Sequence, residues 1–394
     1  MLLENIKLIP RYNWDYGLRE WAQSVYGSFF PDTESTDFLE TMLGRKAIFT
    51  NSGRTSLFAI LKALHLPSES GIGVPLFCCP VVFDAICQAG YKPVFIDSNP
   101  DDFNISAKDI LKKRGSIKAI IAVHMFGRSA DMDAILDAAE GIPVIEDCAQ
   151  SLFSKYKNRW TGSLSSVSFY SFRSGKYISA GEGSFIFSRD ETLHDSIQEV
   201  VNEFEDWSAL KMMLQSSSTY VKSKLYKKPL YGLVGYPIGK KLDQRFNLTA
   251  KTGFGAKKIA QSNLTIINNR LKSFHENIVQ QRENSRCLIE KISLDNGVLP
   301  EFDPEINFYQ FPLRLRDVQQ RDNLSNFLMK KGIDTAKYLD DIVDIALNKY
   351  DYQFDCPIAE KDSKTDLIIP NHYTLSKKDL YHIISSVNCS EKYL

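Results

Sequence analysis

The residue with the clearest chemical potential is Lys176, which stands alone between small and apolar residues. An alternating aromatic run at 167–172 predicts a buried strand, and a turn-like Arg-Ser-Gly segment leads from it to the lysine. Burial at a strand end disfavours the ammonium form, so the neutral amine becomes able to attack a carbonyl group. The alternative is an ordinary solvated lysine in a loop, which is the more common setting for this residue type.

Two further groups would complement such an amine. Residues 46–50 predict a short strand, and the Asn-Ser-Gly-Arg-Thr-Ser segment 51–56 leads from it into an apolar helix. This arrangement gathers backbone N–H groups and a helix dipole where a phosphate can bind, although a plain capped helix shows the same pattern. Asp147 follows a predicted strand at 143–146, either as a helix N-cap or as a carboxylate beside a cationic heterocycle. Together with Lys176, these groups suit a cofactor with a phosphate, a ring nitrogen and an aldehyde.

The elements that must position these groups alternate between strands and helices. Strands are predicted at 72–76, 93–97, 119–124 and 143–146, and helices at 80–89, 106–113 and 132–139. This alternation predicts an α/β fold with a parallel sheet covered on both faces. Ligands of such sheets bind outside the carboxyl ends of the strands, where Asp147, His124 and Lys176 are expected. We expect His124 to be a packing residue there rather than a catalytic one.

Composition argues against several classes of protein. The 394 residues include 48 basic and 48 acidic side chains, and this balance gives no sign of a nucleic-acid partner. The cysteines at positions 78, 79, 87, 148, 287, 356 and 389 lack metal-ligand spacing, so no metal site is expected. Their odd number and the lack of a signal-peptide pattern predict a reducing, cytoplasmic location. No apolar run approaches the roughly 18 residues that span a membrane.

Several motifs occur in an order that indicates one family. They are Ser52-Gly53-x-Thr55, residues 119–127 with 130–133, residues 144–151, Thr161-Gly162-Ser163, Ser171-Phe172-x-x-x-Lys176 and Gly181-Glu182-Gly183. In these motifs the chain closely resembles the PLP-dependent sugar aminotransferases of the DegT/DnrJ/EryC1/StrS group. The resemblance is strongest from about residue 40 to about residue 190 and continues more weakly to Pro370.

The resemblance implies an aspartate-aminotransferase-like fold of type I, in which a large domain carries a mostly parallel, seven-stranded sheet. We therefore expect a large PLP-binding domain at 1–245 and a smaller C-terminal α/β domain at 246–394. Because the family forms dimers with shared active sites, a homodimer is expected here as well.

The same resemblance implies roles for individual residues. Lys176 is expected to bind PLP covalently, and Asp147 to pair with the pyridine nitrogen. Gln150 is expected against the ring or its hydroxyl group. Phosphate contacts are expected from Gly53, Arg54, Thr55, Ser171 and, across a dimer interface, Asn247. An aromatic residue usually stacks on the ring, but the corresponding position here holds Cys79, with Phe77 nearby as the other candidate.

The resemblance implies amino transfer from an amino acid, with glutamate as the expected donor, to the keto group of a nucleotide-linked sugar. Such sugars serve surface polysaccharide or glycoconjugate biosynthesis. The chain departs from the family pattern at Arg54, Thr249 and Tyr338, so a non-nucleotide ketone stays open as the acceptor. A non-catalytic protein of the same fold is a further alternative, although it would not need Lys176, Asp147 and the phosphate-binding residues together.

Residues 203–246 form a longer connection than the family usually has, with aromatic, leucine and methionine residues interleaved with lysines. A helical lid or dimer-packing arm is the main interpretation. Because basic amphipathic segments also bind anionic lipid, weak membrane association through this segment is the alternative. Downstream, a helical rhythm at 261–289, a strand at 308–314 and helices at 321–331 and 375–387 are predicted.

Overall fold

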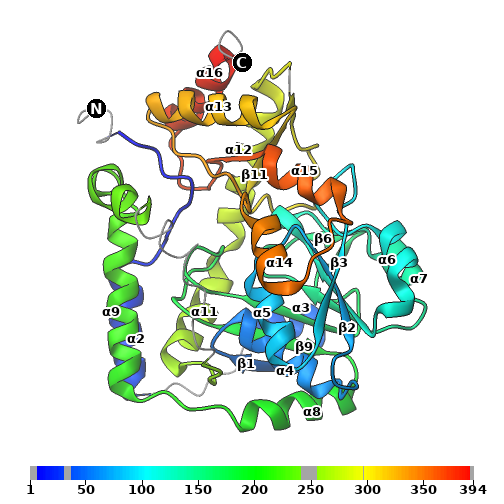
Figure 1. The fold of residues 1–394 in the computed structure, drawn as a ribbon. Helices are drawn as coiled ribbons and strands as arrows, with labels where there is room; N and C mark the ends of the chain where they lie inside the picture. The colour runs from blue at the N-terminus through cyan, green and yellow to red at the C-terminus, as the bar shows by residue number, and fades with distance from the viewer. Residues whose placement is uncertain (1–6, 31–36, 241–254, 296, 391–394) are drawn as a thin grey trace.

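The computed structural model describes residues 7–30, 37–240, 255–295 and 297–390. Two main β-sheets organise the chain, and helices pack against both of them (Figure 1). The expected phosphate ligand Asn247 lies outside the described residues, as does Thr249. The domain division between residues 245 and 246 falls in the same stretch and stays a prediction.

The large sheet confirms the predicted mostly parallel, seven-stranded architecture. Its strands lie in the order β1-β9-β8-β5-β4-β2-β3, and only β9 is antiparallel to its neighbours. The strands are β1 (Ala47–Thr50), β2 (Gly71–Pro75), β3 (Lys92–Ile96), β4 (Ala119–Val123), β5 (Val144–Asp147), β8 (Val167–Ser171) and β9 (Ser184–Ser188). The carboxyl ends of β4, β5 and β8 therefore meet at one edge of the sheet.

Helices cover both faces of this sheet, as the alternation of elements predicts. In β4, Ile121 belongs to a core shared with α4 and α5, whereas Ile120 belongs to a second core with α6 and α7. Successive residues of a strand point to opposite faces, so both cores use the same strand. The helices are α4 (Gly53–Ala63), α5 (Val81–Gln88), α6 (Ala107–Lys113), α7 (Met132–Ala139) and α8 (Glu191–Asn202). Short elements between them are η1 (Arg114–Ser116), η2 (Met125–Gly127), β6 (Lys155–Tyr156) and β7 (Arg159–Trp160).

The C-terminal sheet is antiparallel and has the order β10-β11-β12. Its strands are β10 (Gly297–Val298), β11 (Phe311–Leu315) and β12 (Asp366–Ile369). The surrounding helices are α12 (His275–Lys291), α13 (Val318–Lys330), α14 (Ile342–Tyr350), α15 (Pro357–Thr365) and α16 (Lys377–Ser390). The strand predicted at 308–314 begins later than expected because Phe308 has a φ of 51°, which is incompatible with an extended strand. The helix predicted at 261–289 is interrupted at Phe274, between α11 (Gln261–Ser273) and α12.

The described part of the predicted arm, 203–240, is largely helical. Its long helix α9 (Ala209–Leu225) packs along α2 (Leu18–Phe29), which α3 (Asp37–Leu43) follows in the chain (Figure 1). The Trp21 indole N–H donates to Ser217 Oγ at 3.0 Å. Beyond α9, the short π-helix η3 (Tyr231–Gly235) is held by a hydrogen bond from the Tyr231 hydroxyl to Asp334. Within the described ranges, no helix has the length and apolar character needed to cross a bilayer.

Candidate active site

Seven of the residues predicted from the sequence surround one cavity of about 130 Å³ at the carboxyl ends of β5 and β8. They are Gly53, Arg54, Cys79, Asp147, Gln150, Ser171 and Lys176. Of the other two, Thr55 is buried and does not line this cavity, and Asn247 lies outside the described residues. The parallel strands bring these groups together, because Asp147 pairs in register with Val123 of β4 and Phe169 of β8.

The start of α4 forms one wall of the cavity. Ser52 Oγ caps the helix by accepting the Thr55 N–H at 3.2 Å. The Thr55 hydroxyl donates to Asn51 Oδ1 at 2.6 Å, so it is already engaged in the cap, and its expected phosphate contact stays a prediction. Gly53 allows the helix to approach β8 closely, since a Cβ atom there would lie 3.3 Å from Ser171 Cβ. The dipole and first N–H groups of this helix favour an anion at the cavity.

A well-bonded loop presents Lys176 to the cavity. The Lys176 N–H donates to Arg173 O at 2.9 Å, and the Gly175 N–H donates to Ser179 Oγ at 3.0 Å. Tyr309 donates its hydroxyl to Gly175 O at 2.7 Å. The ring of Tyr309 has its centroid 5.2 Å from the Lys176 Nζ atom. The lysine therefore has a fixed backbone and an aromatic surface beneath its amine.

The electrostatics of the cavity favour a neutral amine. Burial, followed by the charge of Arg173, lowers the pKa of Lys176 from 10.5 to about 8, while Asp147 acts in the opposite direction. Burial also raises the pKa of Asp147, whereas the Ala149 N–H, 2.9 Å from Oδ1, and the charge of Lys176 lower it. A cationic group bound beside Asp147 would therefore keep its carboxylate ionised.

Gln150 and Cys79 complete the walls. Gln150 Oε1 accepts the Phe126 N–H at 3.1 Å, and Nε2 lies 3.4 Å from the Tyr338 hydroxyl. Phe77, the other candidate for stacking on a cofactor ring, is fully buried against the rings of Phe126 and Tyr338 and does not line the cavity. Of the two candidates, only Cys79 faces the cavity, and its contact with a ring stays a prediction.

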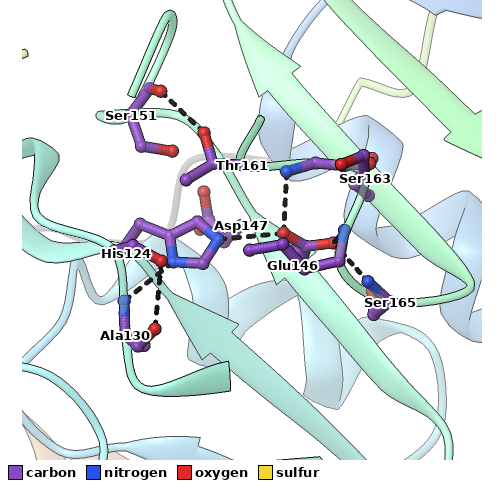
Figure 2. A network of polar contacts seen from close by, with 12 residues as sticks. His124, Ala130, Glu146, Asp147, Ser151, Thr161, Ser163 and Ser165 are labelled. Atoms are coloured by element: carbon purple, nitrogen blue, oxygen red, sulfur yellow. Dashed lines mark hydrogen bonds and ion pairs between the residues drawn. The ribbon is translucent and has the colours of Figure 1, made fainter. Parts of the chain in front are cut away.

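A buried carboxylate next to Asp147 in β5 holds the strand end in place (Figure 2). Glu146 accepts hydrogen bonds from three backbone N–H groups, those of Gly162 (2.7 Å), Leu164 (2.8 Å) and Ser165 (2.6 Å). Its Oε2 atom also lies 3.1 Å from His124 Nε2. Because His124 Nδ1 accepts the Ala130 N–H at 3.1 Å, the proton of the neutral ring lies on Nε2. These bonds join the ends of β4 and β5 to the turn 162–165.

The predicted packing role of His124 is confirmed, since its side chain is fully buried within this network. Ligand-type atoms of His124, Glu146 and Cys148 lie within 4.8 Å of one another. Both nitrogens of the histidine and both oxygens of the glutamate already have hydrogen-bond partners in the protein. Burial raises the pKa of the Cys148 thiol well above its usual value, which opposes the thiolate that a metal requires. We therefore assign the group a structural role.

Several residues of the site have no local signal in the sequence. Arg173 lines the cavity beside Lys176, and Tyr309 approaches the amine from a segment far along the chain. A second cavity of about 270 Å³ adjoins the first, and its lining includes Tyr12, Trp14, Tyr226 and Tyr338. These residues come from the N-terminal segment, the arm and the C-terminal part, so no spacing within one motif could identify them.

The lowered pKa of Lys176 predicts how its reactivity depends on pH. In the cofactor-free protein, acylation by acetic anhydride should reach half its maximal rate at about pH 8, because only the neutral amine reacts. Peptide mass spectrometry over a pH series measures this rate, with the exposed Lys108 as an internal reference. A midpoint near the ordinary value of 10.5 would contradict the effect of burial and Arg173.

The Glu146 network predicts a large stability effect. Glu146→Gln should lower the free energy of unfolding by about 3 kcal/mol. Each carboxylate oxygen of Glu146 accepts two hydrogen bonds, and the amide N–H₂ that replaces one of them cannot accept any. Chemical denaturation measures this energy. Glu191→Gln, which alters an exposed carboxylate at the start of α8, should change it by less than about 0.5 kcal/mol. Equal stability of the two variants would show that the turn 162–165 does not depend on the carboxylate.

Comparisons with known proteins agree with this geometry. The sequence profile of the DegT/DnrJ/EryC1/StrS aminotransferase family matches residues 34–388. GDP-perosamine synthase of Escherichia coli O157:H7 is 26% identical over 371 residues, which cover 93% of this chain and 91% of that enzyme. UDP-2-acetamido-2-deoxy-3-oxo-D-glucuronate aminotransferase of Pseudomonas aeruginosa is 33% identical over 180 residues, 44% of this chain and 50% of that enzyme. The crystal structure of the sugar aminotransferase CalS13 from Micromonospora echinospora has a TM-score of 0.76 at 17% identity, covering 97% of this chain and 100% of that one.

The family profile spans most of the chain, and the structural likeness extends over both sheets. The fold class, the cofactor and the enzyme class expected from the sequence motifs are thereby confirmed. The chain belongs to the DegT/DnrJ/EryC1/StrS family of PLP-dependent sugar aminotransferases, with the fold-type-I architecture.

Proposed function

We propose that the protein transfers an amino group from an amino-acid donor, with glutamate as the expected donor, to the keto group of a nucleotide-linked sugar. The observation that carries this proposal is a single cavity lined by Lys176, whose pKa is lowered to about 8, by the buried Asp147 and by the start of α4. An aldehyde requires an amine, a protonated ring nitrogen requires a carboxylate, and a phosphate requires N–H donors. PLP carries an aldehyde, a ring nitrogen and a phosphate.

The residues of the cavity fit PLP, and we assign their roles accordingly. Lys176 would hold the cofactor covalently, and Asp147 would face its ring nitrogen. The phosphate would lie at the start of α4, where the binding residues are Gly53, Arg54, Thr55 and Ser171. Gln150 and Cys79 would flank the ring, and Asn247 keeps its expected role as a phosphate ligand from a second subunit. When bound, PLP supplies an electron sink for the bonds that break at the donor's α-carbon.

Lys176 would transfer the proton, and Asp147 would control the protonation of the cofactor ring. Once it is free of the cofactor, the neutral amine of Lys176 would accept the proton from the donor's α-carbon and would then donate it, as the acid, to the former aldehyde carbon of the cofactor rather than back to the donor. A pKa of about 8 suits both steps, because a general base works best when its pKa lies near the operating pH. The carboxylate of Asp147 keeps the ring nitrogen protonated, and burial strengthens this interaction by lowering the local dielectric constant.

A nucleotide-linked acceptor is supported by two observations. The relatives from E. coli and P. aeruginosa bear names that refer to GDP- and UDP-linked sugars. The second cavity beside Lys176 also has five aromatic side chains in its wall, which offer apolar faces with polar edges. At 26% identity to the E. coli enzyme, these names support the class of acceptor rather than one sugar. We assign the product to surface polysaccharide or glycoconjugate biosynthesis.

Removal of the amine tests the proposal directly. Lys176→Ala should lose both covalent cofactor attachment and amino transfer, because the reacting group is gone. Borohydride reduction of the wild-type protein with PLP, followed by peptide mass spectrometry, should place the label on residue 176. Asp147→Asn should keep the label and lose turnover, which separates attachment from catalysis. Full activity of Lys176→Ala, or an unlabelled residue 176 in the wild type, would overturn the assignment.

We also propose a homodimer, supported by exposed apolar side chains on two helices that pack together. On α9 these are Leu210, Leu214 and Val221, and on α2 they are Leu18, Tyr26 and Phe29. Leu210→Glu combined with Leu214→Glu should convert the dimer to a monomer in sedimentation analysis, whereas Leu111→Glu, on an exposed site of α6, should not. A monomeric wild type would refute the dimer.

Wild-type binding to phosphatidylserine vesicles that the double variant loses would support the alternative membrane role of 203–246.

A further inference from the structure

The two cavities meet at three residues, Cys79, Arg173 and Lys176, which line both of them. The inner cavity, of about 130 Å³, contains the groups assigned to the cofactor. The outer one, of about 270 Å³, has five aromatic side chains in its wall and no carboxylate among the described residues that line it. A ligand that reaches Lys176 through the outer cavity therefore passes Arg173 and meets no carboxylate among the described residues that line this cavity.

Arg173 is held by its backbone, while its side chain is exposed. The Phe172 N–H donates to Gly183 O at 2.8 Å, and the Ser174 N–H donates to Gly181 O at 3.0 Å. These bonds fix the loop on both sides of Arg173. Its guanidinium forms no hydrogen bond or ion pair with any residue that the structure describes. Its charge acts to lower the pKa of Glu182, against the effect of burial. A rigid backbone with an unused guanidinium is a suitable receptor for an anionic ligand.

We propose that Arg173 binds the α-carboxylate of the amino-acid donor, an inference that rests on the proposed amino transfer. In a donor, the α-carboxylate is one bond from the α-carbon, whose proton must reach Lys176. The diphosphate of a nucleotide-linked sugar is separated from its reacting carbon by part of the sugar ring. A guanidinium next to the lysine therefore suits the donor carboxylate better than the acceptor diphosphate. Two parallel N–H groups of the planar guanidinium can donate to the two oxygens of a carboxylate.

The charges in the cavity suggest a second consequence of this contact. After burial, Arg173 is the strongest influence that lowers the pKa of Lys176, ahead of the opposing effect of Asp147. A bound carboxylate would neutralise Arg173 and thereby remove this influence. The freed amine would become more basic once a donor is in place, when it has to accept a proton.

Donor binding by Arg173 variants tests the proposal. With the cofactor loaded and the acceptor absent, added glutamate should bleach the visible absorbance band of the bound cofactor, and its concentration dependence gives an apparent Kd. Arg173→Ala should raise this Kd by about 10- to 100-fold, because a charge-assisted pair is lost. Arg173→Lys should restore part of the affinity. Arg316→Ala is the control, since that side chain is 71% exposed and lines neither cavity.

A second comparison identifies the carboxylate and keeps the two proposals apart. The α-amide of glutamate should bind wild type and Arg173→Ala equally well, whereas glutarate, which has no amino group, should lose affinity in the variant by calorimetry. An unchanged glutamate Kd in Arg173→Ala would overturn the inference, as would a loss confined to cofactor affinity or to the KM of the acceptor. A wild-type protein that accepts no amino group from any donor would instead overturn the proposed function.

Discussion

A buried carboxylate that has to be fully hydrogen-bonded determines the shape of the candidate active site. Glu146 is out of contact with solvent, and an ionised side chain is stable there only with enough donors around it. Although burial acts to raise it, the pKa of Glu146 is lowered by the hydrogen bonds from His124 and from the turn 162–165. The same turn is held from outside by Arg45, which donates to carbonyl oxygens of Gly162, Ser163 and Ser165.

This constraint extends to the reacting groups because side chains alternate along a strand. With Glu146 fixed on one face of β5, Asp147 has to point to the other, where β8 and the start of α4 approach. Lys176 arrives at the same place from a loop that is closed by its own hydrogen bonds and by Tyr309. The cavity thus brings an amine and a carboxyl together, and burial shifts both pKa values toward the uncharged forms, while the charge of each group acts in the opposite direction on the other.

The outer cavity depends on segments that are remote from this sheet in the sequence. Trp14 packs edge-on against Tyr226 with ring centroids 4.8 Å apart, which joins the N-terminal segment to the end of the arm. Asp334 then accepts the Tyr231 hydroxyl and lies 3.5 Å from Arg11, so the arm and the N-terminal segment share one buried anchor. The arm therefore contributes Tyr226 to the wall of the outer cavity.

The sequence by itself determined the alternation of strands and helices in the large sheet, and it predicted that Lys176, Asp147 and the start of α4 belong to one site, which the structure places around one cavity. These features depend on patterns within a few residues, on hydrophobic periodicity and on motifs of fixed spacing. Only the tertiary structure decided that Phe77 is buried away from the inner cavity. It also decided that Arg173, whose guanidinium has no hydrogen bond or ion pair with any described residue, lies between that cavity and an outer one lined by Tyr309 and Trp14. Those outcomes depend on contacts between segments far apart in the chain, which leave no trace in local periodicity.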